Sequence, residues 1–338
     1  MGKTIYDVAK EAGVGIATVS RVLNKTGYVS EKTRKKVEAA AKDYVPKAAA
    51  REMGAQRAKT LLLAFAHDPE YFFVNSVYMH AMMGIADVCK EKDYRMLMDI
   101  NRNTEDILEL LRSGKADGAI LMGMRKNDTL IACLEKESLP FILIGTYGSD
   151  GESDFCQIDV DNKALAKEAV QHLLMLGHRK IGFISGSLEY GSCLARLNGY
   201  LEALKEAGIK KKEEYIVTTD SITDEKAYNL ARKLLYQPDR VSAVFAFNDM
   251  VAAAVYKAAS DMGMYIPEDL SVVGFDDTEW ARYVTPPLTT VRQPSYKKGY
   301  DAAKILIESF EHPELRKKSR ILDGMLIYRD SCKEYKEQ

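Results

Sequence analysis

Residues 4–24 read TIYDVAKEAGVGIATVSRVLN, and the apolar positions of this stretch follow two short helical repeats. The side chains that share one helix face are Ile5, Val8, Ala9 and Ala12 in the first repeat and Val19, Val22 and Leu23 in the second. Between the repeats, Gly13 permits the backbone conformation that a sharp turn requires. The second helix leaves small and polar side chains on its other face. The stretch therefore predicts a helix-turn-helix, whose second helix suits a DNA major groove.

Charge is distributed unevenly along the chain. Residues 1–59 hold 13 Lys and Arg against 6 Asp and Glu, whereas the whole chain has a net charge of −1. A basic N-terminal segment on an acidic body indicates nucleic-acid binding, because lysine and arginine neutralise phosphates. A solvated basic face would explain residues 32–36 (KTRKK) alone, but not an excess that stops near Lys59.

A third helix and a weaker one follow. Ser30 suits the N-cap of a helix from about Glu31 to Asp43, which would complete a three-helix headpiece. Residues 44–54 read YVPKAAAREMG, where Pro46 favours a helix start. Because two turns of helix are only marginally stable in water, we expect this segment to become helical on a partner.

Both segments resemble the LacI/GalR family of bacterial transcriptional regulators, and the resemblance runs from Thr4 to about Ser331. Residues 4–24 match the family's T-x-x-D-V-A-x-x-A-G-V-x-x-x-T-V-S-R-V-L-N signature. Its hinge-helix pattern is matched by Tyr44, Pro46, Ala50, Arg51 and Met53. The resemblance implies that paired hinge helices of a dimer enter the minor groove, where an apolar wedge opens a base step. Lys47, which replaces the usual Asn, Ala50 and the wedge residue Met53, which replaces the commoner Leu, are then expected to contact DNA.

The resemblance also assigns contacts to the headpiece. It implies that Ile16, Ala17 and Arg21 read bases, since arginine can donate two hydrogen bonds to guanine and an apolar side chain can touch a thymine methyl group. The expected phosphate contacts, which set the register on the duplex, are Thr4, Tyr6, Thr18, Ser20 and Asn24. The alternatives are that Ile16 belongs to the core and that Arg21 forms a surface ion pair.

Residues 60–331 alternate short apolar runs with helical patterns. The runs predict strands at 60–66, 95–100, 119–122, 141–144, 181–184, 243–246 and 272–275, and a helix is expected at about 75–92. Buried strands separated by helices predict parallel sheets in an α/β fold. A body of this length exceeds one comfortable core, so we expect it to divide into two lobes.

The resemblance implies the same architecture, a periplasmic-binding-protein type I-like body of two doubly wound parallel-sheet lobes behind an all-α headpiece. We place the helix-turn-helix headpiece at 1–45, the hinge helix and linker at 46–59, and the effector-binding and dimerisation domain at 60–338. Its first lobe would take about 60–158 and 293–320, and its second about 159–290 and 321–332. Ligands bind at the carboxyl ends of such strands, here in the cleft between the lobes.

Polar side chains after the second lobe's strands are candidates for the cleft wall. Arg196 lies beyond the 181–184 strand, Asn248 and Asp249 follow the 243–246 strand, and Asp276 follows the 272–275 strand. Acids and amides with an arginine suit sugar hydroxyls, and the resemblance assigns effector contacts to Arg196, Asn248 and Asp276. Asn248 and Asp249 would serve equally as helix caps, and Arg196 as a surface cation.

An aromatic turn follows the first strand. Residues 67–73 read HDPEYFF, a longer and more aromatic run than the Asn-Pro-Phe-Phe-like turn of the family. Phe72 and Phe73 are our candidates to stack on an effector, as is the neighbouring Tyr71, with core packing as the equal alternative. Trp280 would lie near the lip of the cleft, as a dimer contact or a ligand platform.

Several absences limit the function. Five cysteines are scattered without CxxC spacing, which favours a reducing cytoplasm over a disulfide framework or a metal site. We find no charged-then-apolar leader, no 18-residue apolar run, no P-loop and no nucleophile–base pattern. The sequence therefore predicts a cytoplasmic protein that is not an enzyme, with no catalytic residue, cofactor, metal or membrane partner.

The expected partners follow from the DNA-binding prediction. One helix-turn-helix reads few base pairs, so a homodimer on a near-palindromic double-stranded operator is expected. The tail after Arg329 is too short for a heptad tetramerisation segment. The predicted function is transcriptional repression controlled by a small-molecule effector, a sugar. A purine-type corepressor, a phosphorylated carrier-protein partner and an extracytoplasmic receptor are the alternatives.

Overall fold

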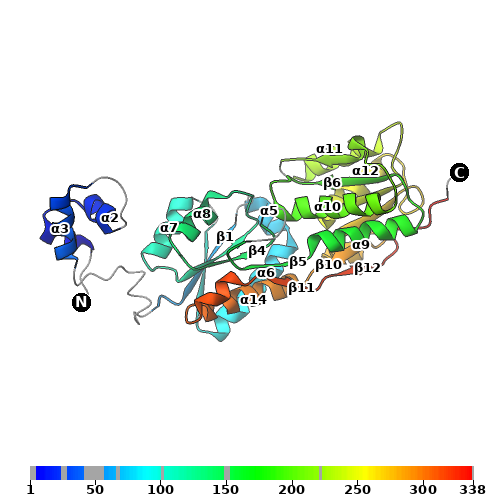
Figure 1. The fold of residues 1–338 in the computed structure, drawn as a ribbon. Helices are drawn as coiled ribbons and strands as arrows, with labels where there is room; N and C mark the ends of the chain where they lie inside the picture. Colours follow the sequence, from blue (N-terminus) through cyan, green and yellow to red (C-terminus); the bar gives the residue numbers. More distant parts are fainter. Residues whose placement is uncertain are drawn as a thin grey trace. The chain divides into compact units, whose positions relative to one another are not determined.

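The computed structural model describes residues 5–23, 29–41, 57–65, 69–99, 103–147, 153–220 and 223–336. The chain separates into two compact units, the first containing the N-terminal helices and the second the large α/β body (Figure 1). Each unit is described by itself.

The headpiece contains three short helices around a small core. They are α1 (Ile5–Ala12), α2 (Ile16–Leu23) and α3 (Glu31–Ala40). Gly13, at φ 66°, makes the turn between α1 and α2, as predicted. Ser30 caps α3, its hydroxyl accepting a hydrogen bond from the Thr33 N–H at 3.3 Å. The buried residues are Val8, Ala9, Ala12, Val19, Val22, Val37 and Ala40. The predicted helix-turn-helix is therefore present.

Two six-stranded sheets form the body. The first sheet has the order β11 (Arg320–Leu322), β5 (Gln157–Val160), β4 (Phe141–Ile144), β3 (Gly118–Met122), β1 (Thr60–Phe65) and β2 (Arg95–Asp99), with every pairing parallel. The second has the order β12 (Met325–Ile327), β10 (Thr289–Arg292), β9 (Ser271–Asp276), β8 (Ala243–Ala246), β6 (Ile181–Ser185) and β7 (Ile216–Thr218). Only the β10–β12 pairing is antiparallel there. The two predicted parallel-sheet lobes are confirmed.

Helices cover both faces of each sheet (Figure 1). The first lobe carries α5 (Pro69–Val74), α6 (Ser76–Glu91), α7 (Thr104–Arg112), α8 (Thr129–Lys136), α14 (Ser295–Glu308) and the 3₁₀ turn η2 (Pro313–Lys317). The second carries α9 (Asn162–Met175), α10 (Gly191–Glu206), α11 (Asp224–Leu235), α12 (Asp249–Asp261), α13 (Glu279–Tyr283) and η1 (Glu213–Tyr215). α6 and α14 cross so closely that a Cβ on Gly299 would lie 1.8 Å from the Ala81 carbonyl oxygen. This crossing therefore requires glycine.

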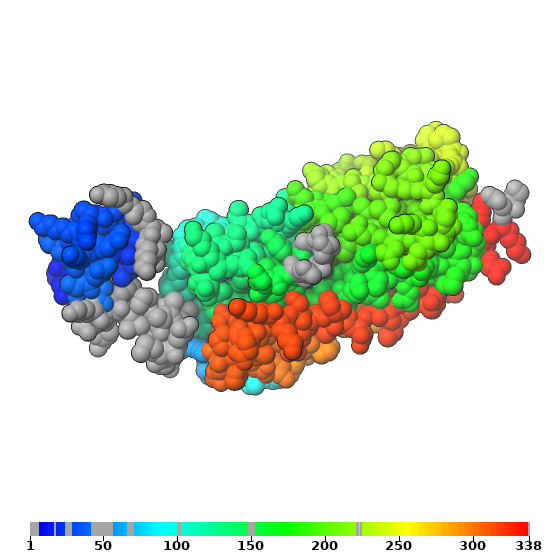
Figure 2. Space-filling view, viewed as in Figure 1, coloured from blue at the N-terminus to red at the C-terminus, as the bar shows by residue number. Residues whose placement is uncertain are grey.

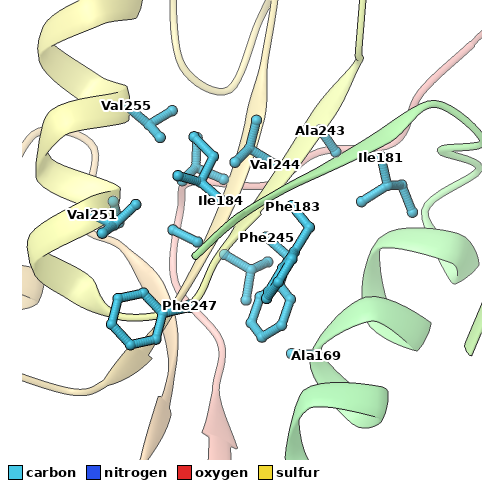
Figure 3. Close-up of a cluster of buried hydrophobic side chains, with 14 of the residues drawn as sticks. Ala169, Ile181, Phe183, Ile184, Ala243, Val244, Phe245, Phe247, Val251 and Val255 are labelled. Carbon is cyan, nitrogen blue, oxygen red and sulfur yellow. The ribbon is translucent and has the colours of Figure 1, made fainter. Parts of the chain in front are cut away.

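Coverage of both faces explains why the strand sequences are continuously apolar. In the second lobe, Phe183 of β6 and Phe245 of β8 are fully buried, with ring centroids 5.5 Å apart (Figure 3). Val251 and Val255 of α12 pack on one side of the strands and Ala169 of α9 lies on the other (Figure 3). Strands buried on both faces lose the polar–apolar alternation of a half-exposed sheet.

The chain passes between the sheets after β5, after β10 and after β11. The first of these passages leads into α9, the second into α14 and the third into β12. β11 and β12 are edge strands of the two sheets, so this last segment runs along the side of the body (red in Figure 2). Two predicted lobe boundaries need correction. β5 extends the first lobe beyond residue 158 to Val160, and β11 assigns 320–322 to the first lobe, because both strands pair within its sheet.

None of the helices in the described ranges combines the length and the apolar character needed to cross a membrane.

Candidate functional site

A cleft of about 1050 Å³ lies in the body, between side chains of both lobes. The first lobe contributes Tyr71, Tyr78, Arg125 and Thr146, and the second contributes Tyr190, Arg196, Asn248 and Asp276. Asp159, Gln293 and Lys298, which lie at or just after two passages between the lobes, also line it. The wall therefore combines aromatic, charged and amide groups, as small-molecule sites do.

Arg196 is held rigidly in this wall from the second turn of α10. Its Nε donates to Oδ1 of Asn162 at 2.9 Å, and its Nη1 donates to the Phe247 carbonyl oxygen at 2.5 Å. The guanidinium carbon lies 3.5 Å from the centre of the Phe275 ring. Nη2, for which the described residues provide no hydrogen-bond acceptor, lies 3.8 Å from Oδ1 of Asp276. The guanidinium plane is thus fixed with one donor group beside the Asp276 carboxylate.

Asp276 is the last residue of β9 and has a φ of 119°, which turns its side chain out of the strand pattern. Its Oδ1 accepts a hydrogen bond from Nε2 of Gln293 at 2.5 Å. No described residue donates to Oδ2, although the side chain is almost completely buried within the protein. Burial raises the pKa of Asp276, and Arg196 and Gln293 oppose that rise. The residue thus offers one unused acceptor at the cleft wall.

Lys298 connects this acid to a second one. Its ammonium donates to Oδ1 of Asp159 and to Oε1 of Gln293. Oδ2 of Asp159 accepts from Thr146 at 2.8 Å and from Asn162 at 2.7 Å. Burial alone would raise the pKa of Asp159, but Lys298 and the hydrogen bonds from Thr146 and the Val160 N–H hold it below its usual value. Both cations at this end of the cleft are therefore already paired with acids.

These contacts form a closed circuit that we call the interlobe ring. In order, its members are Arg196, Asn162, Asp159, Lys298, Gln293 and Asp276, and the ion pair from Asp276 to Arg196 closes it. The ring takes side chains from both lobes and from the first two passages between them. Sequence reasoning identified only Arg196 and Asp276 of its members. The available signal was the position of Asp159 and Gln293 at the predicted boundaries between the lobes, near residues 158–159 and 290–293.

Asn248 has two contacts. Its Oδ1 caps α12 by accepting from the Val251 N–H at 2.9 Å, and its Nδ2 donates to the Tyr71 hydroxyl of the first lobe at 3.4 Å. The position of Asn248 is therefore compatible with both interpretations of the sequence, a helix cap and a cleft residue.

Asp249 is not part of the cleft wall. Its Oδ1 accepts from the Thr290 hydroxyl at 2.6 Å, and its Oδ2 accepts from the Thr278 N–H at 2.7 Å and the Thr278 hydroxyl at 3.0 Å. These bonds use both oxygens within the second lobe. The prediction that placed Asp249 among the cleft residues is corrected, because the side chain turns toward β9 and β10 and away from the cavity.

The prediction that Phe72 and Phe73 of the aromatic turn stack on the effector is also corrected. Phe72 is fully buried and stacks on Phe65 of β1 with ring centroids 3.9 Å apart, and Phe73 is 49% exposed but lies outside the cleft wall. Tyr71 lines the cleft instead. Successive residues of α5 point about 100° apart, so only one of the three can face the cavity. Trp280 packs edge-on against Tyr256 and does not line the cleft.

The DNA-contact prediction can be compared with the structure only in part. Ile16 at the start of α2 is 41% exposed and Arg21 is exposed, so neither belongs to the headpiece core. Thr18 and Ser20 are partly exposed on the same helix. Thr4, Asn24, Lys47, Ala50 and Met53, and the side chains of Tyr6 and Ala17, lie outside the described residues.

Comparison with known proteins agrees with this architecture. Residues 4–47 match the family described as bacterial regulatory proteins, lacI family, and residues 170–332 match a periplasmic binding protein-like domain. The transcriptional repressor PurR of Proteus mirabilis (strain HI4320) is 35% identical over 344 residues, covering 96% of this chain and 98% of the relative. The ribose operon repressor of Escherichia coli (strain K12) is 33% identical over 341 residues, covering 97% and 99%.

A solved structure described as a transcriptional regulator CelR–cellobiose complex matches with a TM-score of 0.76. The two chains are 29% identical over 97% of this chain and 99% of that one. The similarity thus spans the headpiece and both lobes. The chain belongs to the lacI family of bacterial regulatory proteins and is a DNA-binding transcriptional repressor with an effector domain, in a family whose members are not enzymes.

Proposed function

We propose that the effector of this repressor is a sugar, and that it binds in the interlobe cleft. The observation that supports this best is the pairing of an unused acceptor, Oδ2 of Asp276, with an uncommitted donor, Nη2 of Arg196, at the inner end of the cleft. A sugar hydroxyl both donates and accepts, so adjacent hydroxyl groups can satisfy both atoms. Tyr71 adds an aromatic face for the apolar side of a sugar ring. The similar chains named for cellobiose and for a ribose operon support the same class of ligand.

A purine-type corepressor is the second candidate for the cleft. The observation that favours it is the pair of tyrosines, Tyr71 and Tyr78, which line the first-lobe side and could stack on a flat base. A phosphorylated carrier protein is the third candidate, and in that case small molecules would leave operator binding unchanged.

The effector would act through the relative position of the lobes. Arg196 and Asp276 belong to the interlobe ring, so a ligand that binds them would change the contacts of this ring. The ring joins both lobes and two of the passages between them. A ligand that favours one arrangement of the lobes shifts the protein toward it. We propose that the sugar weakens operator binding, as an inducer. By reciprocity, operator DNA would weaken sugar binding by the same factor.

On DNA, we propose a homodimer that places two headpieces on a near-palindromic operator, with Ile16, Ala17 and Arg21 reading bases. A protein that acts on the chromosome of a bacterium works in the cytoplasm. Arg21→Ala is expected to reduce discrimination between operator and random duplex by about 1–3 kcal/mol. Operator titrations at fixed salt measure this change, and full discrimination by the variant would disprove base reading by Arg21.

The effector proposal is tested by a thermal-shift screen of sugars and purine bases on the full-length protein. A hit is then added to the operator titration. We expect a sugar to raise the melting temperature and weaken operator binding, and Asp276→Asn to remove both effects. If a purine base is the sole compound that binds, the second candidate is established. If the Asp276→Asn variant still responds to the bound compound as the wild type does, the cleft assignment is disproved.

A further inference from the structure

The cleft continues beyond the interlobe ring along the start of α10. Tyr190, the residue before this helix, lines the cleft together with Gly191, Ser192, Cys193 and Arg196. Tyr190 and Arg196 are six positions apart, which corresponds to about 9 Å of helix rise. The volume of about 1050 Å³ slightly exceeds the usual range for small-molecule sites, about 300–1,000 Å³. The cleft therefore has room for a ligand that extends along α10 beyond Arg196.

The outer end of this wall is built by the two lobes together. Arg125, in the loop after β3, and Tyr190 form an isolated antiparallel bridge, and the Lys126 N–H donates to the Glu189 carbonyl oxygen at 2.7 Å. Nε of Arg125 donates to the Tyr190 hydroxyl at 3.1 Å, and Nη1 of Arg125 lies 3.4 Å from the Glu189 carboxylate. These contacts orient the Tyr190 ring and join the two lobes at this end of the cleft.

An aromatic side chain of the first lobe lines the same cavity. Tyr78 is held by Phe72, on which it stacks with ring centroids 5.4 Å apart, and by an edge contact with Tyr71 at 6.2 Å. With Tyr190 from the second lobe, it offers a second aromatic surface to the cleft. The two ends of the cleft therefore differ chemically. The inner end holds the buried charges of the interlobe ring, and the outer end holds aromatic rings and an arginine that is already paired.

We propose that Arg125 and Tyr190 form a second sugar subsite, so that the effector is a saccharide of two linked rings. One ring would bind Arg196 and Asp276, and the other would stack on Tyr190. Tyr190 is then the residue that selects a disaccharide over a monosaccharide. This inference rests on the proposed sugar effector and specifies its size.

The test compares matched mono- and disaccharides by isothermal titration of the full-length protein. The probes are D-glucose with cellobiose and maltose, D-galactose with lactose, D-ribose, and hypoxanthine as a free base. One disaccharide is expected to bind at least tenfold more tightly than either of its component monosaccharides. Tyr190→Ala should weaken disaccharide binding at least tenfold more than monosaccharide binding, whereas Tyr190→Phe, which keeps the ring, should retain most of the preference for the disaccharide.

Two controls separate the subsite from general damage. Tyr236→Ala removes a tyrosine that is 83% exposed and outside the cleft, and should leave every affinity unchanged. Asp276→Asn should weaken mono- and disaccharides alike. A monosaccharide that binds as tightly as any disaccharide, or a Tyr190→Ala variant that weakens both classes equally, would overturn the second subsite while leaving the sugar effector in place. Binding of hypoxanthine alone, or of no probe, would instead overturn the sugar effector and this inference with it.

Discussion

The second lobe contains two kinds of buried polar cluster, and they differ in whether their hydrogen bonds close within the lobe. Asp249 uses both carboxylate oxygens on Thr278 and Thr290, and His178 bonds to Ser242, Ser271 and the Lys333 carbonyl oxygen. Arg196 and Asp276 bond into the interlobe ring instead, and each keeps an atom without a hydrogen-bond partner among the described residues.

The closed cluster and the open cluster are therefore expected to have different roles, one in stability and the other in ligand binding. A closed cluster can only contribute to the stability of the lobe, because all its bonding capacity is used. An open cluster has desolvated charge and unused donors or acceptors, which a ligand can satisfy. Substitutions in the closed cluster should therefore change stability alone, and substitutions in the open cluster should change effector binding.

The largest effect is expected from Arg196→Met. Methionine fills much of the space but removes the donors to Asn162 and Phe247 and leaves Lys298 as the sole cation of the ring. Breaking a buried pair by removing one partner costs about 3–5 kcal/mol, so the free energy of unfolding should fall by about that amount, with loss of the effector response.

Urea denaturation measures the change in stability. The matched control is Lys257→Met, which removes an exposed cation paired with Asp261 at 2.5 Å on α12 and should cost less than about 1 kcal/mol. Equal losses for the two variants would show that the ring does not stabilise the lobes.

Asp276→Asn should act on binding more than on stability. Asparagine can still accept from Gln293, but it cannot present a charged oxygen to the ligand. Losing hydrogen bonds to a charged group costs about 2–3 kcal/mol, so the effector affinity should fall about 30- to 150-fold. Isothermal titration with the sugar found in the screen measures the change. If Asp249→Asn weakens binding equally, the distinction between open and closed clusters fails.

Sequence alone predicted the architecture because apolar runs report burial directly. Every apolar run that we assigned as a strand is one, and the helix expected at 75–92 is α6 with Asn75 as its N-cap. The strands that were missed, β5, β7, β10, β11 and β12, have only three or four residues each, and β5 and β10 also carry polar residues such as Gln157, Asp159 and Arg292. Their positions depend on pairing with distant strands, which no local pattern encodes.

The site was less predictable, since strand ends identify candidates but not the direction of each side chain. Asp276 ends β9 and Asp249 lies just beyond the adjacent strand β8, and only the backbone turn at Asp276 and the threonines around Asp249 distinguish them. Phe72 and Tyr71 are neighbours in sequence and differ only by one step around α5. Lys298 gave no signal at all, because its partner Asp159 is 139 residues away in the chain.

Asp249→Ala should give the complementary result to Asp276→Asn. The substitution leaves the Thr278 N–H and the Thr290 hydroxyl without their acceptors in a buried place. Stability should fall by about 2 kcal/mol, with effector affinity unchanged. Urea denaturation and titration on the same preparation measure both. Glu213→Ala, which removes an exposed acid outside the cleft, provides a control for stability. A selective loss of effector binding by Asp249→Ala would return this residue to the site.

The smallest effect is a pH dependence of stability that arises from His178. Burial is the main reason that the pKa of this histidine is lowered to about 4; the hydrogen bond to the Lys333 carbonyl oxygen opposes this shift, and the nearby His172 adds to it. The unfolded chain takes up a proton near pH 6.5 while the folded protein keeps the ring neutral, so the free energy of unfolding should fall as the pH drops from 6.5 toward 4. Between pH 7 and pH 5 the loss should be about 1–2 kcal/mol.

His178→Gln, which keeps neutral hydrogen-bonding groups, should lower stability at pH 7 and flatten this slope, whereas the exposed His312→Gln should leave it unchanged. Urea denaturation at a series of pH values gives the slope for each variant. Because His178 belongs to the closed cluster, effector affinity relative to wild type should stay constant across the same pH range. A pH-dependent loss of binding in His178→Gln would mean that this cluster communicates with the cleft, and the division between the two kinds of burial would no longer hold.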